Sequence, residues 1–378
     1  MKLSDGRTGR SMRGILKWWR SPFWLLQLAT GAKSFADNPI LGSSALNQLG
    51  LHVWRLKAAH AFAGSRRARL AHLVPTELRA QFDRDGFVVL PNFLPADEFA
   101  SFQSAMLSSE LPTRMHQQGD TITRRVAIGP QMLSSFPQLR AMLDSPVWTG
   151  LMAYVASTRS KPLYYLQTIL GGVVEGPPDP QLELHADTFH PSLKAWFFLT
   201  DVPEDGRPLT YVAGSHLLSP ERIAWEKRRS TEVLLNGDSL SRRGSLRVST
   251  DELAGLGLPQ PTSFAVPANT LVVADTCGFH ARADSNRPTT RVELWAYSRR
   301  TPFLPWAAGG LLSWRPIADR RAEWLTAILD WLDRKRLKKQ HWKPDGLRPA
   351  VEPAAATPGA ETESAPIPER HLPDSQAA

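Results

Sequence analysis

The sequence predicts a mainly β protein with helical extensions (α+β), whose core is a double-stranded β-helix of the jelly-roll or cupin-like type. The first observation is the apolar, aromatic-rich run 194–200, which is typical of a buried strand. The second is the β-branched run 269–275, followed by the stretch 291–298, in which apolar and polar residues alternate as in a half-buried strand. Turn residues separate such runs without a helical period, which favours a barrel or jelly roll.

The segment before the core is basic and is predicted to be helical. Residues 1–80 contain thirteen Lys and Arg against three Asp and Glu, which accounts for the whole net charge of +9. The remaining chain is close to neutral, so the composition gives no reason to expect a nucleic-acid partner. Residues 51–63 carry apolar side chains at helical spacing, and we expect a helix that caps the barrel. We therefore divide the chain into an extension at 1–75 and a core domain at 76–305.

Within this extension, residues 15–30 mix Trp, Phe and Leu with Lys and Arg. Their apolar part, 22–31, is about ten residues long, whereas a spanning helix needs about twenty. A signal peptide is not expected either, since the run contains Gln27 and lacks a small-residue cleavage site. Two interpretations stay open: peripheral membrane contact by a surface-lying helix, or an arm that packs on the core or on a partner subunit.

After the core, residues 306–345 are predicted to form a helical region. The run 321–339 has apolar residues at three-four spacing and cations in its last turns, as an amphipathic helix does. Residues 346–378 are dominated by Pro, Ala, Glu and Ser, and we expect a disordered tail. The single Cys277 excludes an intrachain disulfide and fits a reducing, cytoplasmic location, with or without contact to the inner face of a membrane.

The candidate site is built on His185-Ala186-Asp187, His280 and Arg291. Residues i and i+2 of a strand point to the same side, so His185 and Asp187 can hold one metal ion. Two imidazoles and one carboxylate leave three positions of Fe(II) open, which oxygen chemistry requires. His280 comes from a distant strand, so the site forms only when the sheet closes. The planar guanidinium of Arg291 suits a carboxylate of an acidic cosubstrate.

Residues 78–300 resemble the phytanoyl-CoA dioxygenase (PhyH) family, the iron(II)- and 2-oxoglutarate-dependent oxygenases built on a double-stranded β-helix. Residues 82–94 are similar to the family's opening helix and strand. Residues 206–216 resemble its turn–strand–PGSH segment, with Ala213 where the family usually has Pro. His280, with an arginine eleven residues later, matches the family's distal histidine and cosubstrate arginine.

The resemblance implies Fe(II), 2-oxoglutarate and O2 as cofactors, with succinate and CO2 as products of the cosubstrate. It implies His185, Asp187 and His280 as metal ligands and Arg291 as the anchor of the distal carboxylate. Trp196 aligns with an aromatic residue that the family places beside the cosubstrate, although a core role is an equal alternative. Gln167 is a candidate donor to the cosubstrate carboxylate, and its alternative is an amide on the sheet face.

Three further residues are candidates for binding substrate. His190 is expected to line the pocket entrance without binding metal. Arg282 is expected either to contact an anionic substrate or to point to solvent. Arg125, in a strand-like stretch, is a candidate ligand of the cosubstrate or of the substrate.

We therefore expect a dioxygenase that hydroxylates an aliphatic C–H bond of a small or lipid-like substrate. Asp187 favours hydroxylation over halogenation, since halogenating relatives carry a small residue at that position. One alternative is a cupin-like protein that binds metal without turnover and serves as a sensor or scaffold. Another is a membrane interaction protein that carries the jelly roll as a passenger. Arg291 argues against a pure metal binder, which needs no cosubstrate anchor.

Overall fold

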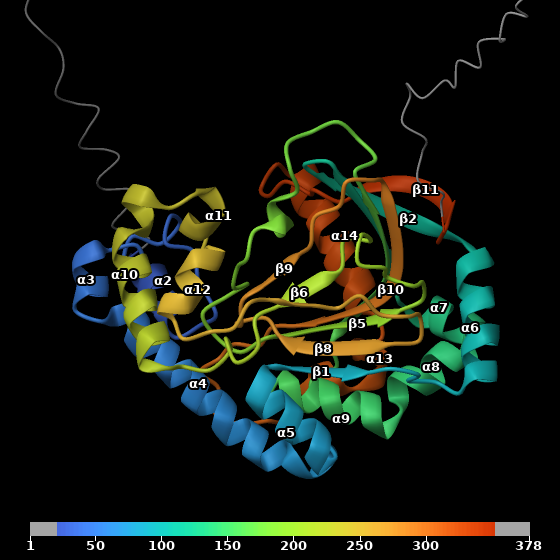
Figure 1. Cartoon of the computed structure of the whole chain (residues 1–378), viewed down its shortest axis with the longest axis horizontal. Coiled ribbons are helices and arrows are strands. Elements are labelled where there is room, and N and C mark those ends of the chain that lie inside the picture. Colours follow the sequence, from blue (N-terminus) through green and yellow to red (C-terminus); the bar gives the residue numbers. More distant parts are fainter. Residues whose placement is uncertain (1–20, 352–378) are drawn as a thin grey trace, which may run out of the picture.

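The computed structural model describes residues 21–351 and consists of an antiparallel jelly roll surrounded by helices (Figure 1). The strands are β1 (Phe87–Leu90), β2 (Glu110–Gln118), β3 (Thr121–Ala127), β4 (Leu163–Gly171), β5 (Leu193–Phe198), β6 (Leu209–Tyr211), β7 (Thr262–Ser263), β8 (Leu271–Asp275), β9 (His280–Arg282), β10 (Thr289–Ser298) and β11 (Lys343–Pro349). The helices are α2 (Ser21–Leu28), α3 (Ser44–Gln48), α4 (Leu51–Leu70), α5 (Thr76–Asp85), α6 (Ala96–Ser108), α7 (Pro130–Ser135), α8 (Pro137–Asp144), α9 (Pro146–Val155), α10 (Pro220–Asn236), α11 (Ser239–Arg242), α12 (Thr250–Gly255), α13 (Arg315–Ala318) and α14 (Arg321–Arg334).

Two sheets form the core. The larger has the strand order β1-β8-β5-β10-β4-β3-β2-β11, and all of its pairs are antiparallel. The smaller has the order β7-β6-β9 and is extended by a bridge between His185 and His280. From β4 onward the chain crosses between the sheets: β4 and β5 lie in the larger, β6 and β7 in the smaller, β8 in the larger, β9 in the smaller and β10 in the larger. This alternation is the connectivity of a double-stranded β-helix, so the predicted fold class is confirmed.

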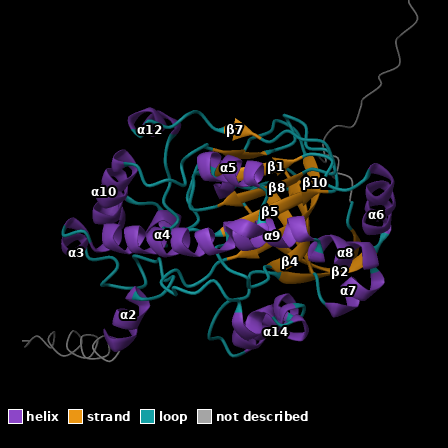
Figure 2. Ribbon diagram, turned by 90° about the horizontal axis from the view of Figure 1, so that it is seen from below, coloured by secondary structure: helices purple, strands orange, loops and turns teal. Residues whose placement is uncertain are grey.

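Strand alternation gives the larger sheet two different faces. Leu166, Phe197 and Leu294 belong to the main hydrophobic core, in which helices α5 to α9 cover the outer face. Trp196 and Trp295, which are register partners, point to the inner face, toward the smaller sheet. Figure 2 shows α9 and α4 lying along one side of the sheet, away from the inner face. The helices thus bury the outer apolar face and leave the polar inner residues of β3, β4 and β10 to form a cavity.

The predicted opening helix and strand, 82–94, meet at Gly86. This glycine ends α5 with φ 84°, a left-handed conformation that favours glycine. A Cβ atom there would lie 2.6 Å from side-chain atoms of Tyr211 and His216, so no larger residue fits. The Gly86 carbonyl then accepts a hydrogen bond from the amide of Asp275, which aligns β1 with β8.

The described part of the N-terminal extension packs on the core. The helix expected near 51–63 is observed as α4, whose buried Arg66 donates to the carbonyl oxygens of Ser157 and Pro302. A second hydrophobic core joins the extension to α10 and α12 and contains Phe35, Trp225 and Leu253. Helices α10 and α12 come between β6 and β7 in the sequence. They belong to the predicted core domain, where the sequence patterns indicated only strands and turns. In Figure 1 they gather with α2 and α3 beside the barrel.

The C-terminal region differs from the expected division at 345/346. The amphipathic helix is present as α14, but residues 343–349 form β11, an edge strand that pairs with β2. The first residues of the expected tail are therefore part of the larger sheet, because the backbone groups of β2 offer a free edge. Residues 1–20 and 352–378 lie outside the described part of the chain, so the expected tail beyond residue 351 and residues 15–20 of the Trp-rich segment are not described. Within residues 21–351, no helix is both long and apolar enough to cross a membrane.

Candidate metal centre

Three predicted ligands meet on the inner side of the smaller sheet. His185 and Asp187 lie on the extended segment before β5, and His280 is the first residue of β9. The amide of each histidine donates to the carbonyl of the other at 3.0 Å, so His185 and His280 are direct cross-strand neighbours. Leu184 and Ala186 point to the opposite side, into the second hydrophobic core. The alternation therefore turns His185 and Asp187 together toward the cavity, as the spacing predicts.

The ligand atoms of these three residues lie within 4.8 Å of one another. Asp187 Oδ1 is 3.8 Å from His185 Nε2 and 3.8 Å from His280 Nε2, too far for a hydrogen bond. His280 Nε2 is buried and has no hydrogen-bond partner within the described chain. Buried polar atoms normally have a partner. An orphaned ring nitrogen that faces a carboxylate and a second imidazole therefore fits a divalent metal ion.

Each imidazole is held in the orientation that a metal ligand requires. His185 Nδ1 lies 2.7 Å from the carbonyl oxygen of Glu183, and His280 Nδ1 lies 3.0 Å from that of Gly278. The Nδ1–H groups donate to these carbonyls, which leaves both Nε2 lone pairs directed into the site. Burial lowers the pKa of His280 to about 4 and the pKa of His185 well below its ordinary value. Both rings are therefore neutral at pH 7, the form that binds metal.

Asp187 lies beside a lysine. Burial alone would raise its pKa, but Lys194, together with His280 and His185 when they are protonated, outweighs burial and holds the pKa of Asp187 below the ordinary value. Lys194 Nζ lies 2.7 Å from Asp187 Oδ2. Lys33 Nζ donates to the backbone carbonyl of Asp187. The carboxylate is thus ionised and held in place before any metal binds.

The cavity in front of these ligands has a volume of about 320 Å³. Six further residues were predicted for the site, and five of them line this cavity: Gln167, Trp196, Arg125, Arg282 and Arg291. His190 differs from the prediction. It is fully buried behind the site, is not among the lining residues, and lies 3.0 Å from the Pro191 carbonyl through Nδ1.

A chain of polar contacts crosses the floor of the cavity. Arg291 Nη1 donates to the carbonyl of Arg207 at 2.7 Å, and its Nε lies 2.9 Å from Glu293 Oε2. Gln167 donates through Nε2 to Glu293 Oε1 at 2.6 Å and accepts from Arg125 Nε at 2.6 Å. Arg291 is therefore fixed in position, but Glu293 already balances part of its charge. A fully buried carboxylate beside the expected anchor is a feature that the sequence patterns did not indicate.

Arg282 and Trp196 have clear surroundings as well. Arg282 lines the cavity and pairs with the buried carboxylate of Asp179, so it does not point to solvent. Trp196 is 5% exposed, lines the cavity and packs in the aromatic cluster around Trp295, so its role beside the cosubstrate stays a prediction and its packing in the core is observed.

Further lining residues were not singled out from the sequence: Lys33, Lys194, Trp295, Arg299 and Trp342. Strand alternation was a usable signal for two of them, because Lys194 lies two residues before Trp196 and Trp295 lies four after Arg291. No local signal marks Lys33 or Trp342, since each comes from a segment outside the barrel.

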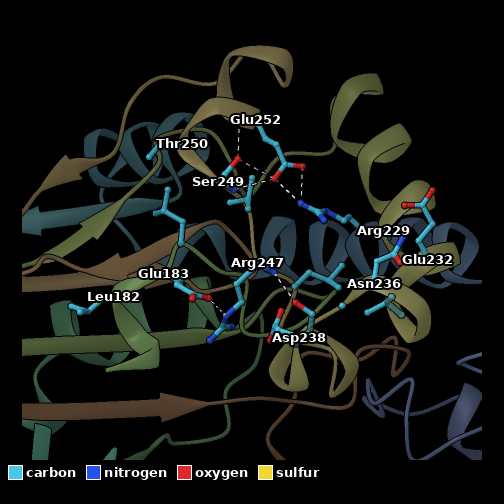
Figure 3. A pocket seen from close by; sticks show the side chains of 16 residues that line it. Leu182, Glu183, Arg229, Glu232, Asn236, Asp238, Arg247, Ser249, Thr250 and Glu252 are labelled. Atoms are coloured by element: carbon cyan, nitrogen blue, oxygen red, sulfur yellow. Dashed lines mark hydrogen bonds and ion pairs between the residues drawn. The ribbon is translucent and has the colours of Figure 1, made fainter. Parts of the chain in front are cut away.

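A larger cavity, of about 580 Å³, lies on the other side of the His185 segment between α10, α11 and α12 (Figure 3). Both of its arginines are paired with carboxylates: Arg229 with Glu252 at 2.6 Å, and Arg247 with Glu183 at 3.3 Å. None of the three metal ligands lines it. The smaller cavity, which holds the ligands and the expected cosubstrate anchor, is therefore the candidate site.

Comparison with known proteins agrees with the resemblance noted in the sequence. Residues 82–234 match the family model of phytanoyl-CoA dioxygenase (PhyH). This family consists of iron(II)- and 2-oxoglutarate-dependent oxygenases, so its cofactors are those expected from the sequence. The comparison with curated proteins finds no match.

Several solved structures are similar at low identity. The epimerase SnoN, solved with Fe3+, alpha ketoglutarate and nogalamycin RO, is 22% identical over 60% of this chain and 83% of its own, with a TM-score of 0.39. The carbocyclase SnoK from nogalamycin biosynthesis is 19% identical over 59% and 83%, with a TM-score of 0.37. HygX from Streptomyces hygroscopicus, solved with nickel and 2-oxoglutarate, is 17% identical over 59% and 86%, with a TM-score of 0.37.

Proposed function

We propose that this chain, which resembles the phytanoyl-CoA dioxygenases over residues 82–234, is an iron(II)- and 2-oxoglutarate-dependent oxygenase that hydroxylates an aliphatic C–H bond. The observation that carries the proposal is the convergence of His185, Asp187 and His280, with the orphaned Nε2 of His280 directed at the other two ligands. Fe(II) bound there, with 2-oxoglutarate and O2, would supply the oxidising chemistry and release succinate and CO2.

The remaining tasks belong to side chains of the cavity. Arg291 is proposed to bind the distal carboxylate of 2-oxoglutarate, and its bond to the Arg207 carbonyl holds the guanidinium plane in place. Gln167 keeps Glu293 hydrogen-bonded on one side, so that this carboxylate stays beside Arg291 instead of entering the cavity. Trp196 closes the apolar wall near the cosubstrate and excludes water from it.

Hydroxylation is the outcome proposed because Asp187 is retained, and a carboxylate at that position fills the place that a halide would need. The main alternative is a metal-binding scaffold without turnover. The cavity of about 320 Å³ and the fixed Arg291 favour an enzyme, since a scaffold has no use for a second anion site beside the metal.

The deciding experiment is an anaerobic titration of the purified chain with Fe(II) and 2-oxoglutarate. The signal measured is the weak visible absorption band of the iron–cosubstrate chelate. We expect a band in the parent, a raised half-saturating 2-oxoglutarate concentration in Arg291→Ala, and no band in His280→Ala. His72→Ala removes an exposed imidazole far from the ligands and should retain the parental band. Iron binding without a band at saturating 2-oxoglutarate would reject the oxygenase proposal and favour the scaffold.

A further inference from the structure

The wall of the metal cavity is unusually rich in positive charge. Of the described residues that line it, six are cationic and only Asp187 is acidic; the cations are Lys33, Arg125, Lys194, Arg282, Arg291 and Arg299. Three of them have a carboxylate partner: Lys194 pairs with Asp187, Arg282 with Asp179, and Arg291 with Glu293. Lys33, Arg125 and Arg299 have no carboxylate within ion-pairing distance in residues 21–351. Arg291 and the metal would neutralise 2-oxoglutarate, so these three charges are left for another anion.

Arg125 is held by two aromatic contacts and one hydrogen bond. Its Cζ lies 4.1 Å from the ring centroid of Trp295 and 4.2 Å from that of Trp342, so its guanidinium is held between two indole rings. Its Nε donates to Gln167 Oε1, whereas no hydrogen bond of its terminal nitrogens is found within the described chain. Cation–π contacts and one hydrogen bond thus fix the plane and leave the two-pronged end available.

Retaining this charge in a buried place has a cost. Burial lowers the pKa of Arg125 to about 10, although Tyr165 and Glu293 partly compensate. A buried cation in a protein is normally paired with an anion. A ligand anion that forms a two-pronged bond with the terminal nitrogens would provide that partner.

A second cavity adjoins the metal cavity at Arg125. It has a volume of about 460 Å³ and lies between α14 and the strands β2, β3, β4 and β10; we call it the α14 cavity. Its lining includes apolar residues such as Ala127, Leu163, Leu325 and Leu329. Arg125, Trp295, Tyr297 and Trp342 line both cavities. The stacked guanidinium therefore stands at the boundary between a cationic space beside the metal ligands and an apolar space beneath α14.

We propose that the substrate is an anionic amphiphile, whose carboxylate or phosphate binds the terminal nitrogens of Arg125, whose apolar chain lies in the α14 cavity, and whose reacting carbon, next to the anionic group, faces the metal cavity. The inference rests on the proposed function, since it takes the metal cavity as the place of reaction. A neutral apolar molecule would leave Arg125, Lys33 and Arg299 unbalanced, and a cationic one would add to their repulsion.

The test is isothermal titration of the full chain with four ten-carbon probes: decanoate, decyl phosphate, decanol and decyltrimethylammonium. We expect one or both anions to bind, decanol to bind about 10- to 100-fold more weakly, and the ammonium probe not to bind, as loss of a charge-assisted hydrogen bond predicts. The preference between decanoate and decyl phosphate identifies the anion.

Variants separate the two parts of the site. Arg125→Gln should weaken the anionic probes by about 10- to 100-fold and leave decanol unchanged, and Arg125→Lys should give an intermediate loss because it keeps charge without the two-pronged geometry. Ala127→Phe should weaken all probes by filling the α14 cavity. Arg84→Gln removes a cation that is 72% exposed and should change nothing.

Two results would overturn the proposal. Equal affinities for decanoate, decyl phosphate and decanol would show that no anion site selects the ligand. A raised half-saturating 2-oxoglutarate concentration in Arg125→Gln, with probe binding unchanged, would assign Arg125 to the cosubstrate instead. The chelate band of the parent is measured in the same preparation. Absence of this band indicates that the proposed function is wrong. A normal band without selective probe binding indicates that only the present inference is wrong.

Discussion

Lys33 donates a hydrogen bond to the backbone carbonyl oxygen of Asp187, across 154 positions of the sequence. The segment that carries Lys33 is fixed on the core by the amides of Phe35 and Ala36, which both donate to the carbonyl of Arg242 at 3.0 Å. The N-terminal extension therefore contributes a cation to the wall of the metal cavity, and it cannot be treated as an independent arm.

Gly244 should be essential for the packing of the Lys33 segment on the core. A Cβ atom at Gly244 would lie 2.2 Å from the backbone oxygen of Lys33, and φ is 84°. Gly257 has φ 65° but nothing within 4 Å of such an atom, so Gly257→Ala isolates the backbone penalty, about 1–2 kcal/mol. We expect Gly244→Ala to lose clearly more unfolding free energy than Gly257→Ala in urea titrations, and to expose residues 30–43 to protease. Equal losses of unfolding free energy in the two variants would mean that the Lys33 segment can move away from residue 244 without destabilising the protein.

Lys194 should compete with the metal for Asp187. Its Nζ lies 2.7 Å from Oδ2, so a bound metal must share or displace this contact. Lys194→Met keeps the length of the side chain, removes the charge and leaves Asp187 Oδ2 without its ion-pair partner. We expect a lower melting temperature of the metal-free protein and a larger stabilisation by Mn²⁺ than in the parent. Lys57→Met, on the exposed side of α4, is the control. An unchanged response to Mn²⁺ would show that Lys194 does not restrain the carboxylate.

Glu226 should make folding sensitive to acid. Its buried carboxylate lies 2.8 Å from His52 Nε2 and 2.9 Å from Arg222 Nη2, and so joins α4 of the extension to α10. Burial alone would raise its pKa, but Arg222 and His52 outweigh burial and lower the pKa from 4.5 to about 2. A lowered folded-state pKa contributes stability that is present above pH 4.5 and is lost as the pH falls toward 2.

This difference in pKa corresponds to on the order of 3 kcal/mol. Urea unfolding at pH 7 and pH 3 should show Glu226→Gln to be less stable than the parent at pH 7 and less dependent on pH. Glu232→Gln, on the exposed side of the same helix, should follow the parent. Identical pH dependence in all three proteins would contradict the assignment.

Membrane contact through the N-terminal segment stays a proposal. The surface that could make this contact is formed by exposed apolar residues of α2 and α14. Phe23 and Leu26 of α2 are 59% and 69% exposed, and Trp324 and Trp331 of α14 are 47% and 49% exposed. Both helices lie at the lower edge of the molecule in Figure 2. Aromatic residues with nearby cations suit the surface of an anionic bilayer.

The measurement is co-sedimentation with vesicles of anionic or of zwitterionic phospholipid. We expect binding to the anionic vesicles, and a loss of several-fold in the double variant Phe23→Ser/Leu26→Ser. Leu49→Ser replaces a leucine that is 85% exposed after α3 and should bind as the parent does. Equal binding by all proteins would exclude α2 as the contact.

The sequence determined the features that depend on short-range periodicity. The i, i+2 spacing of His185 and Asp187 places both side chains on one side of an extended segment, and the alternation in β10 turns Arg291 and Trp295 to the same face. These arrangements follow from backbone geometry, so the fold class and the common orientation of His185 and Asp187 could be predicted from local patterns, whereas His280 was matched only through the family resemblance.

Only the tertiary structure decided which distant segments complete the cavity. Lys33 reaches Asp187 from the extension, and Trp342 stacks on Arg125 from the residue before β11. His190, four residues before the predicted strand 194–200, is buried behind the site instead of lining it. Such contacts depend on chain crossings and edge pairing between segments more than a hundred residues apart, and no local periodicity encodes them.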